Sequence, residues 1–490
     1  MRVLIQTACY CVIDGVSTTI RKLETFLLAN GHHVAILTTS SGQLSNLNIV
    51  PPHPNRSIIF MNAFPLPVMA ESGYKMTKRL SSQNISDMND FNPTVIHVTV
   101  PDLYVLDVLQ YAIDTDTPLI ATWHSNYIEY MDYYEASWIK TSFIEWNRHT
   151  FSFVPKLFVP TPFIKDSLSS SYYQLHQCTE LHVWGRGVDC DKFSPKFRST
   201  DFRSSHSISP DDVAICFAGR LVTEKHCAVY CDVIRKLNKT PRLKQRVVGV
   251  VIGEGAYFKE MSNLPNTVAT GWLNNEALST AYASCDVFLF PSGSETFGNV
   301  TLEACASGLP IVVEKGCSSH LVDNEKNGFA VDRYDADKFF EKTLFLIENK
   351  QTRISMGEHS RKFVAKNYSI DNVMGAICDI YLSESNTKTY SNTCIADNEG
   401  NFPWGRKTLP FNLWLMEWFI WVVVRSTVFL VWSINFLSGG LWKRRAKFSI
   451  SPRIVTKITT FLGSIFTWVI LTCLRDKKKK NSNRIDSGAI

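Results

Sequence analysis

The chain has 490 residues, which is too long for one ordinary hydrophobic core, so we expect two to four domains. Hydrophobic residues make up 45% and charged residues 20%, which excludes a disordered or fibrous protein. The formal charge of +6 arises at the end of the chain, because residues 443–490 hold twelve Lys and Arg but two Asp and Glu. This basic tail suits an anionic lipid surface, and the rest of the chain gives no reason to expect nucleic-acid binding.

The thirteen cysteines are scattered, none forms a CxxC pair, and no histidine cluster has the spacing of a zinc site. We therefore interpret them as reduced, small apolar side chains. The N-terminal run MRVLIQTACYCVIDG lacks the apolar core and cleavage site of a signal peptide. The sequence thus predicts catalytic domains that face the cytosol or an equivalent reducing compartment.

Residues 1–195 alternate between strand-like and helix-like patterns. A helical pattern closed by Gly31 predicts a helix over 17–30, and another helix is expected from Leu103. The predicted strands lie at 2–7, 32–39, 58–62, 94–100 and 119–123. This alternation predicts a doubly wound, mostly parallel sheet. The polar, Ser-rich run 194–210 then indicates an interdomain linker.

The same alternation returns over residues 211–385. The predicted strands there lie at 213–217, 246–252, 267–270, 287–291 and 310–313. We therefore expect an α/β protein with two Rossmann-like domains that face each other across a cleft. Ligands of such sheets bind at the carboxyl ends of the strands, so the cleft is the predicted site.

Two long apolar runs follow a polar linker at 386–410. Residues 411–437 contain Glu417 and Arg425 as their only charges, and residues 454–474 contain only Lys457. About 20 apolar residues span a bilayer as a helix, so 411–474 are predicted to hold two membrane-associating helices, followed by a basic tail at 475–490.

The charges bear on how these segments meet the membrane. A transmembrane hairpin would place the six basic residues of 443–457 on the far side, which the positive-inside tendency opposes. Attachment to one leaflet, with the tail on anionic headgroups, is therefore favoured over a hairpin and over burial in the protein.

Residues 291–310, PSGSETFGNVTLEACASGLP, are the most informative segment. The segment begins where a predicted strand ends, and Gly298 opens a helix whose first N–H groups and dipole suit a phosphate. Glu295 in the loop and Glu303 in the helix can both accept hydrogen bonds from sugar hydroxyls. The residues alone indicate a nucleotide-linked ligand, with an amphipathic helix carrying incidental glutamates as the alternative.

This segment resembles the retaining glycosyltransferases of family 4, which have the two-domain GT-B fold. Further similar segments follow in the family's order: IDGVSTTIRKL at 13–23, TWHSNY at 122–127, VWGRGVDCDKFSP at 183–195, FAGRLVTEKH at 217–226, VIGEG at 251–255 and SCDVFLFPS at 284–292. The resemblance covers roughly residues 1–385. It implies an enzyme that transfers a hexose from a nucleotide-sugar donor with retention at the anomeric carbon, the leaving phosphate helping to deprotonate the acceptor.

The resemblance also implies roles for individual residues. Arg220 and Lys225 would neutralise the donor diphosphate as its charge grows in the transition state. Glu295 would face the transferred sugar, Glu303 the ribose, and His124 the donor sugar near the reacting carbon. The phosphate cradle would be completed by the backbone of Gly15, Phe297, Gly298, Asn299, Val300 and Thr301.

Three Asp-x-Asp strings occur in the chain, of the kind that holds a metal in the other major glycosyltransferase fold. They are Asp114/Asp116, Asp189/Asp191 and Asp335/Asp337. Aspartate is common at helix caps and turns for local reasons. We therefore expect no metal and no other cofactor, the nucleotide-sugar being a substrate.

The acceptor is expected to be a membrane lipid. The aromatic run at 127–146 is either packed in the first domain or forms a lip at the membrane surface. TWHSNYIEYMDYYE and WGRGVD resemble enzymes that transfer mannose from GDP-mannose to lipids, and others that transfer sulfoquinovose from UDP-sulfoquinovose to diacylglycerol. A sulfonated sugar would need an extra cation, for which Lys22, Arg21 and Lys140 are candidates. A soluble sugar acceptor and a non-catalytic scaffold of the same fold are the alternatives.

Overall fold

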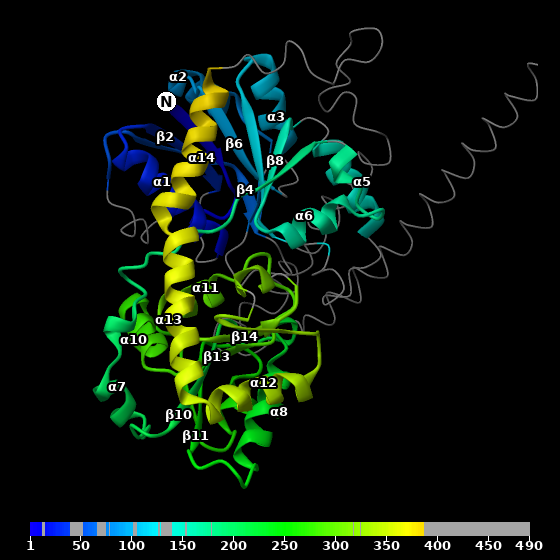
Figure 1. The fold of residues 1–490 in the computed structure, drawn as a ribbon. Coiled ribbons are helices and arrows are strands. Elements are labelled where there is room, and N and C mark those ends of the chain that lie inside the picture. Colours follow the sequence, from blue (N-terminus) through cyan, green and yellow to red (C-terminus); the bar gives the residue numbers. More distant parts are fainter. Residues whose placement is uncertain are drawn as a thin grey trace, which may run out of the picture.

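A seven-stranded parallel sheet organises the first half of the chain, at the blue and cyan end of Figure 1. The computed structural model describes residues 1–386, except for 12–14, 40–51, 66–74, 78, 101–104, 126–127, 129–139, 152–153, 178, 317 and 324. The strands of this sheet are β1 (Arg2–Gln6), β2 (His33–Thr39), β3 (Arg56–Met61), β6 (Val95–Val100), β7 (Leu119–Trp123), β8 (Lys156–Val159) and β9 (Glu180–Val183). A small antiparallel pair, β4 (Ala63–Pro65) and β5 (Lys75–Thr77), lies outside it.

Both faces of this sheet are buried, as expected for a parallel sheet. Successive residues of β1 point to opposite faces, so Val3 and Ile5 belong to one hydrophobic cluster and Leu4 to another. The helices of this half are α1 (Gly15–Ala29), α2 (Ser82–Phe91), α3 (Val105–Asp114), α5 (Lys140–Phe151) and α6 (Pro162–Ser169). Side chains of α1 share the cluster of Val3, whereas those of α3, α5 and α6 share that of Leu4.

A second, six-stranded parallel sheet organises the green half of Figure 1. Its strands are β10 (Val213–Ala218), β11 (Val247–Ile252), β12 (Thr267–Gly271), β13 (Val287–Phe290), β14 (Ile311–Glu314) and β15 (Gly328–Val331). Its helices are α8 (Cys227–Asn238), α9 (Phe258–Ser262), α10 (Asn275–Ala283), α11 (Asn299–Ala306), α12 (Ala336–Glu348) and α13 (Lys350–Asn367). One continuous hydrophobic cluster fills this half.

Both sheets have the doubly wound order. The strands run β3-β2-β1-β6-β7-β8-β9 in the first sheet and β12-β11-β10-β13-β14-β15 in the second. In each case the order reverses next to the first strand, and the crevice outside the carboxyl ends at that point is where such sheets bind ligands. The loop after β13 carries Glu295 and the loop after β10 carries Arg220 and Lys225, so these residues follow the two strands that flank the reversal.

The chain returns to the first domain through α14 (Ile370–Ser385), which Figure 1 shows running beside α1. The hydroxyl of Tyr381 lies 2.6 Å from Nδ1 of His97 on β6, and both residues are buried. The indole of Trp184, just after β9, donates to the backbone oxygen of Val373 at 3.0 Å. These contacts fix α14 to the first sheet.

The structure confirms two parallel, Rossmann-like sheets. It adds β8, β9 and β15, which the sequence did not predict, and it shows a short helix, α7 (Thr200–Ser205), inside the predicted linker. The apolar segments at 411–474 lie outside the described residues. Among the residues that are described, no helix is long and apolar enough to cross a membrane.

Candidate active site

Lys225 and Glu295 meet at the carboxyl edge of the second sheet. The ammonium of Lys225 forms an ion pair with Oε1 of Glu295, and the hydroxyl of Ser292 donates to the same oxygen at 3.0 Å. Lys225 is 8% exposed, so this pair is shielded from water. The structure therefore brings together the cation and the carboxylate that the sequence assigned to the donor diphosphate and sugar.

A network around the buried carboxylate of Glu314 supports the loop that carries Glu295. His226 donates from Nδ1 to the backbone oxygen of Pro291 at 2.9 Å, and the same nitrogen lies 3.1 Å from Oε2 of Glu314. Arg333 donates to Oε1 of Glu314 at 2.7 Å and to the backbone oxygen of Gly293 at 2.8 Å. A side chain at Gly293 would collide with both partners, since its Cβ would lie 2.2 Å from Glu314 and 2.6 Å from Arg333.

The N-terminus of α11 follows directly. Gly298 caps the helix with a φ of 95°, a left-handed conformation that favours glycine. The hydroxyls of Thr301 and Ser318 lie beside it, and both are buried without a hydrogen-bond partner among the described residues. The ring of Phe297 is buried against His320, so this side chain belongs to the core. The free N–H groups of the first helical turn are thus the groups that can meet a phosphate.

The first domain reaches this site through α1. A Cβ on Gly15, the first residue of α1, would lie 3.4 Å from the side-chain nitrogen of Asn299, the first residue of α11. Two helix N-termini from opposite domains therefore face each other, and both present a positive dipole end to the space between them.

Glu303 and Lys22 lie in the same region. The hydroxyl of Tyr282 is 3.4 Å from Oε2 of Glu303. Burial raises the pKa of Glu303, and the positive charge of Lys22 opposes that shift. Lys22 donates to the backbone oxygen of Gly187 at 2.8 Å, and burial lowers its pKa. Lys22 is therefore placed by its contacts near the predicted ribose site.

The remaining basic candidates are placed differently. The Arg220 side chain is 60% exposed and lies 3.6 Å from Glu224, so its guanidinium is accessible from solvent. Arg21 donates to the backbone oxygen of Tyr10 at 2.5 Å and lies over the Tyr10 ring. Lys140 is the first residue of α5.

His124 immediately follows β7 and is 5% exposed. Its Nδ1 lies 3.0 Å from a guanidinium nitrogen of Arg186, and its Nε2 is buried without a partner among the described residues. Burial, followed by the charge of Arg186 and by His97, lowers the pKa of His124 well below its usual range. Arg186 lies within WGRGVD, but the sequence alone assigned it no role. The signal available there was a charged residue between two glycines at the end of a domain.

Two of the three Asp-x-Asp strings have a local structural role. Asp189 accepts from the backbone nitrogens of residues 191 and 192, and Asp335 caps α12 through the nitrogen of Lys338. Within the described part of the chain, no group of three or more His, Cys, Asp or Glu side chains is placed to hold a metal.

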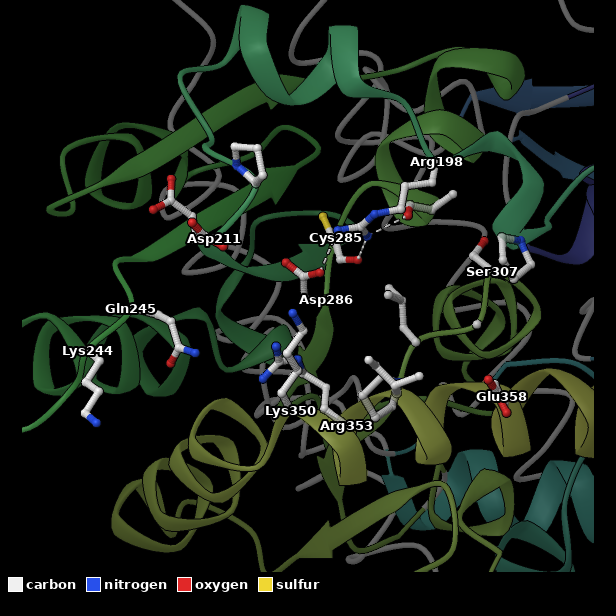
Figure 2. Close-up of a pocket in the computed structure, with 18 residues that line it drawn as sticks. Arg198, Asp211, Lys244, Gln245, Cys285, Asp286, Ser307, Lys350, Arg353 and Glu358 are labelled. Atoms are coloured by element: carbon white, nitrogen blue, oxygen red, sulfur yellow. Dashed lines mark hydrogen bonds and ion pairs between the residues drawn. The ribbon is translucent and has the colours of Figure 1, made fainter.

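A cavity of about 690 Å³ lies at the opposite edge of the second sheet (Figure 2). It is lined from the linker, from the amino ends of the strands and from α13, and it contains none of the predicted site residues. Its charged side chains balance, with Arg198 paired to Asp286 at 2.8 Å as the dashed lines show. We therefore do not assign the reaction to it.

Comparison with known proteins agrees with this geometry. Residues 13–192 match the family model "Glycosyltransferase Family 4", and residues 198–363 match "Glycosyl transferases group 1". The chain is 28% identical to a sulfoquinovosyl transferase of Arabidopsis thaliana over 73% of this chain and 68% of that protein. It is 28% identical to a GDP-mannose-dependent alpha-mannosyltransferase of Mycolicibacterium smegmatis over 65% and 81%, respectively. It is 25% identical to an alpha-monoglucosyldiacylglycerol synthase of Streptococcus pneumoniae over 61% and 68%.

The fold is also that of a solved structure. The sucrose-phosphate synthase of Thermosynechococcus elongatus superposes with a TM-score of 0.62 at 15% identity, covering 78% of this chain and 98% of that one. The two family models together span both sheets. The chain is a glycosyltransferase and belongs to the family 4 enzymes with the GT-B fold.

Proposed function

We propose that the chain transfers a hexose from a nucleotide-sugar donor to a membrane lipid, such as diacylglycerol or a glycolipid, with retention at the anomeric carbon. The observation that carries this proposal is the meeting of Lys225, Glu295 and the N-terminus of α11 opposite Gly15. Positive groups and free N–H donors converge there on a space that two domains enclose. This is the arrangement that a diphosphate leaving group needs, since its negative charge grows as the glycosidic bond breaks.

The assigned roles follow the chemistry of each group. Lys225, with Arg220 at the solvent side, would stabilise the departing diphosphate. Glu295 would accept a hydrogen bond from a hydroxyl of the transferred sugar while its charge stays neutralised by Lys225. Glu303 would accept from the ribose hydroxyls. The leaving phosphate would take the proton of the acceptor hydroxyl, as the resemblance to family 4 implies.

The acceptor assignment is supported by two observations. The apolar runs at 411–437 and 454–474, with the basic residues around them, suit attachment to an anionic membrane. One of the similar proteins is a glucosyldiacylglycerol synthase. The catalytic domains would then lie at the membrane on the cytosolic side, where all nine described cysteines would remain as free thiols, as in the structure.

The donor is proposed as GDP-mannose or a UDP-sugar such as UDP-sulfoquinovose. Similar proteins include a GDP-mannose-dependent enzyme and a sulfoquinovosyl transferase. The experiment that decides is thermal stabilisation of the purified full-length chain by a panel of UDP- and GDP-sugars. A ligand at one hundred times its dissociation constant stabilises by about 2.7 kcal/mol. Stabilisation by one base series and loss of that stabilisation in Lys225→Met would support the proposal. No stabilisation by any donor would contradict it.

A further inference from the structure

Arg186 is a buried cation that has no carboxylate partner among the residues that the structure describes. Its residue is 4% exposed, and among the described residues it contacts backbone oxygens and one imidazole. Nη1 lies 3.3 Å from the backbone oxygens of Trp184 and Gly185, and Nη2 lies 3.0 Å from Nδ1 of His124. Burial lowers the pKa of Arg186 to about 9. Buried charges are usually paired, because desolvation of an unpaired ion is costly. The burial of the Arg186 guanidinium among these neutral groups therefore needs an explanation.

The surroundings hold the guanidinium in place. It lies 5.3 Å from the centre of the Trp184 ring, and the Trp184 indole is tied to α14 through Val373. The glycines on either side allow close packing: a Cβ on Gly185 would lie 3.4 Å from Phe297, and one on Gly187 would lie 2.9 Å from the Cα of Ile370. Arg186 is thus fixed where the first domain, α14 and the loop before α11 meet.

The contact between Arg186 and His124 fixes the state of the imidazole. A guanidinium can only donate, so Nδ1 of His124 must be the acceptor. The neutral ring then carries its proton on Nε2. An imidazolium would place an Nδ1–H group against the N–H group of Arg186, so the contact also opposes protonation. His97 adds no proton donor here, because Tyr381 and Thr122 occupy its two nitrogens and burial lowers its own pKa to about 3.

The second ring nitrogen of His124 is Nε2. It is buried and has no partner among the residues that the structure describes. Leaving a buried donor without a hydrogen bond destabilises the protein, and a bound oxygen atom would restore that bond. The ligand that completes it must accept a hydrogen bond, as a sugar hydroxyl or ring oxygen can.

We propose that Arg186 is a positioning residue, which holds His124 in the neutral Nε2–H form so that His124 donates a hydrogen bond to an oxygen of the transferred sugar. The inference rests on the proposed function for the identity of that sugar. It excludes His124 as the base of the reaction, because the only lone pair on its ring is occupied by Arg186. His124 instead serves as a fixed donor, which would orient the sugar and stabilise charge that develops on it.

The test is the tautomer of His124 in the full-length protein in detergent, labelled with ¹⁵N-histidine. Comparison with His124→Gln identifies its two nitrogens among those of the 12 histidines. The wild type is expected to show a protonated Nε2 and an unprotonated Nδ1 throughout the range from about pH 5 to about pH 8. A protonated Nδ1, or an imidazolium in this range, would overturn the proposal whether or not the protein is active.

Variants separate positioning from general packing. Arg186→Met keeps the length of the side chain but removes every donor, and it should give mixed His124 tautomers and a kcat reduced about tenfold or more, with a smaller change in donor KM. Arg186→Lys keeps one donor and should retain the tautomer and part of kcat. Arg353→Met is the matched control, since Arg353 is 8% exposed and donates to two backbone oxygens of the second domain, beside the cavity in Figure 2.

The control should leave both the His124 spectrum and kcat unchanged. If Arg186→Met folds and His124 keeps a single Nε2–H tautomer, Arg186 does not set that state and the proposal is wrong. If Arg186→Met does not fold, the His124 tautomer in the wild type and in Arg186→Lys still tests the proposal. A wild type with the expected tautomer that neither binds nor uses any sugar nucleotide would contradict the proposed function and the sugar-facing role, while the contact between Arg186 and His124 would stand.

Discussion

Lys225 and Glu295 form a shielded ion pair although they lie 70 residues apart in the chain. They meet because β10 and β13 are neighbours in the sheet, so the loops that follow the two strands leave the same edge side by side. Hydrogen bonds between a lysine and a carboxylate are charge-assisted and stronger than neutral ones. The pair therefore couples the group proposed to hold the sugar to the group proposed to stabilise the leaving diphosphate.

The first prediction concerns this pair and Arg220. Glu295→Gln keeps the volume but removes the charge, and Arg220→Ala removes the guanidinium proposed to lie at the diphosphate. Each is expected to lower turnover about 100-fold or more, because such contacts strengthen as charge develops in the transition state. Initial rates at saturating donor provide the measurement.

The control for this prediction is Glu348→Gln, which breaks an exposed ion pair with Arg242 on the second domain. Exposed pairs of this kind contribute little to stability, so the control should keep nearly wild-type activity. Near-wild-type turnover in both Glu295→Gln and Arg220→Ala would overturn the assignment of the site.

The second prediction concerns His226, which supports the loop of Glu295. His226 has a φ of 50° and donates to Pro291. In His226→Ala the loop loses this bond, so Glu295 should be held less firmly and kcat should fall about tenfold. In Arg333→Lys the two hydrogen bonds from the guanidinium to Glu314 and Gly293 are lost, so kcat is again expected to fall. Unchanged kcat in both variants would show that the loop keeps its position without this network.

The third prediction concerns pH and His97, which has a pKa lowered to about 3 by burial and then by Arg186. The unfolded chain binds a proton at this residue below about pH 6.5, and the folded chain does not. Stability from the neutral His97 is thus fully present above about pH 6.5 and is lost as the pH falls toward the folded value, at up to about 1.4 kcal/mol per pH unit. His97→Gln removes this dependence.

Melting temperatures measured at pH 7 and pH 5 test this prediction. His97→Gln should melt at a lower temperature than the wild type at pH 7, because the hydrogen bonds of His97 to Tyr381 and Thr122 are lost. At pH 5 this difference in melting temperature should be smaller. Tyr381→Phe is the matched control, since it removes one of the same bonds and keeps the imidazole. The gap between Tyr381→Phe and the wild type should not narrow. A constant gap for His97→Gln would mean that His97 is protonated in the folded protein.

Much of the fold could be predicted from the sequence, and the reasons are local. The strands β1, β2, β6 and β10 are rich in β-branched or apolar residues, so their composition and length identify them without knowledge of their neighbours. The strands β8 and β9 have four residues each, and each carries charged or histidine side chains. Their assignment depends on the pairing of β8 with β7 and of β9 with β8, which a local pattern does not contain.

The site residues also fall into two groups, those that a local motif identifies and those that only the fold brings together. Glu295, Gly298 and Glu303 lie in one segment of nine residues, so a single motif could identify them. The role of Arg186 depends on His124, 62 residues earlier, and on Trp184, which is tied to α14. Only the folded chain brings these groups together. The same holds for the support of the Glu295 loop by Arg333, 40 residues beyond Gly293.

The fourth prediction concerns attachment to the membrane. Deleting residues 404–490 removes both apolar runs and fifteen Lys and Arg residues but neither parallel sheet. The shortened chain is expected to be soluble, to fold and to bind the sugar nucleotide, whereas transfer to lipid should fall. The full-length chain should stay with the membrane pellet at high salt, because two apolar segments bury far more surface than one acyl chain.

Two outcomes would contradict this view of the tail. Release of the full-length protein by salt would mean that attachment is electrostatic. Aggregation of the shortened chain, or loss of donor binding, would mean that the segments belong to the catalytic core.

The most direct measurement follows a labelled sugar from nucleotide-sugar donors into extractable lipid, using the full-length chain in vesicles that contain diacylglycerol and anionic phospholipid, with EDTA present. We expect a glycolipid with the anomeric configuration of the donor. It should form without divalent metal, because Lys225, Arg220 and a helix N-terminus neutralise the phosphate charge. Glu295→Gln should form much less of it. The absence of a lipid product with every donor, or equal product formation by Glu295→Gln, would contradict the proposed function. An absolute requirement for Mn²⁺ or Mg²⁺ would mean that one of the Asp-x-Asp strings takes part in the reaction.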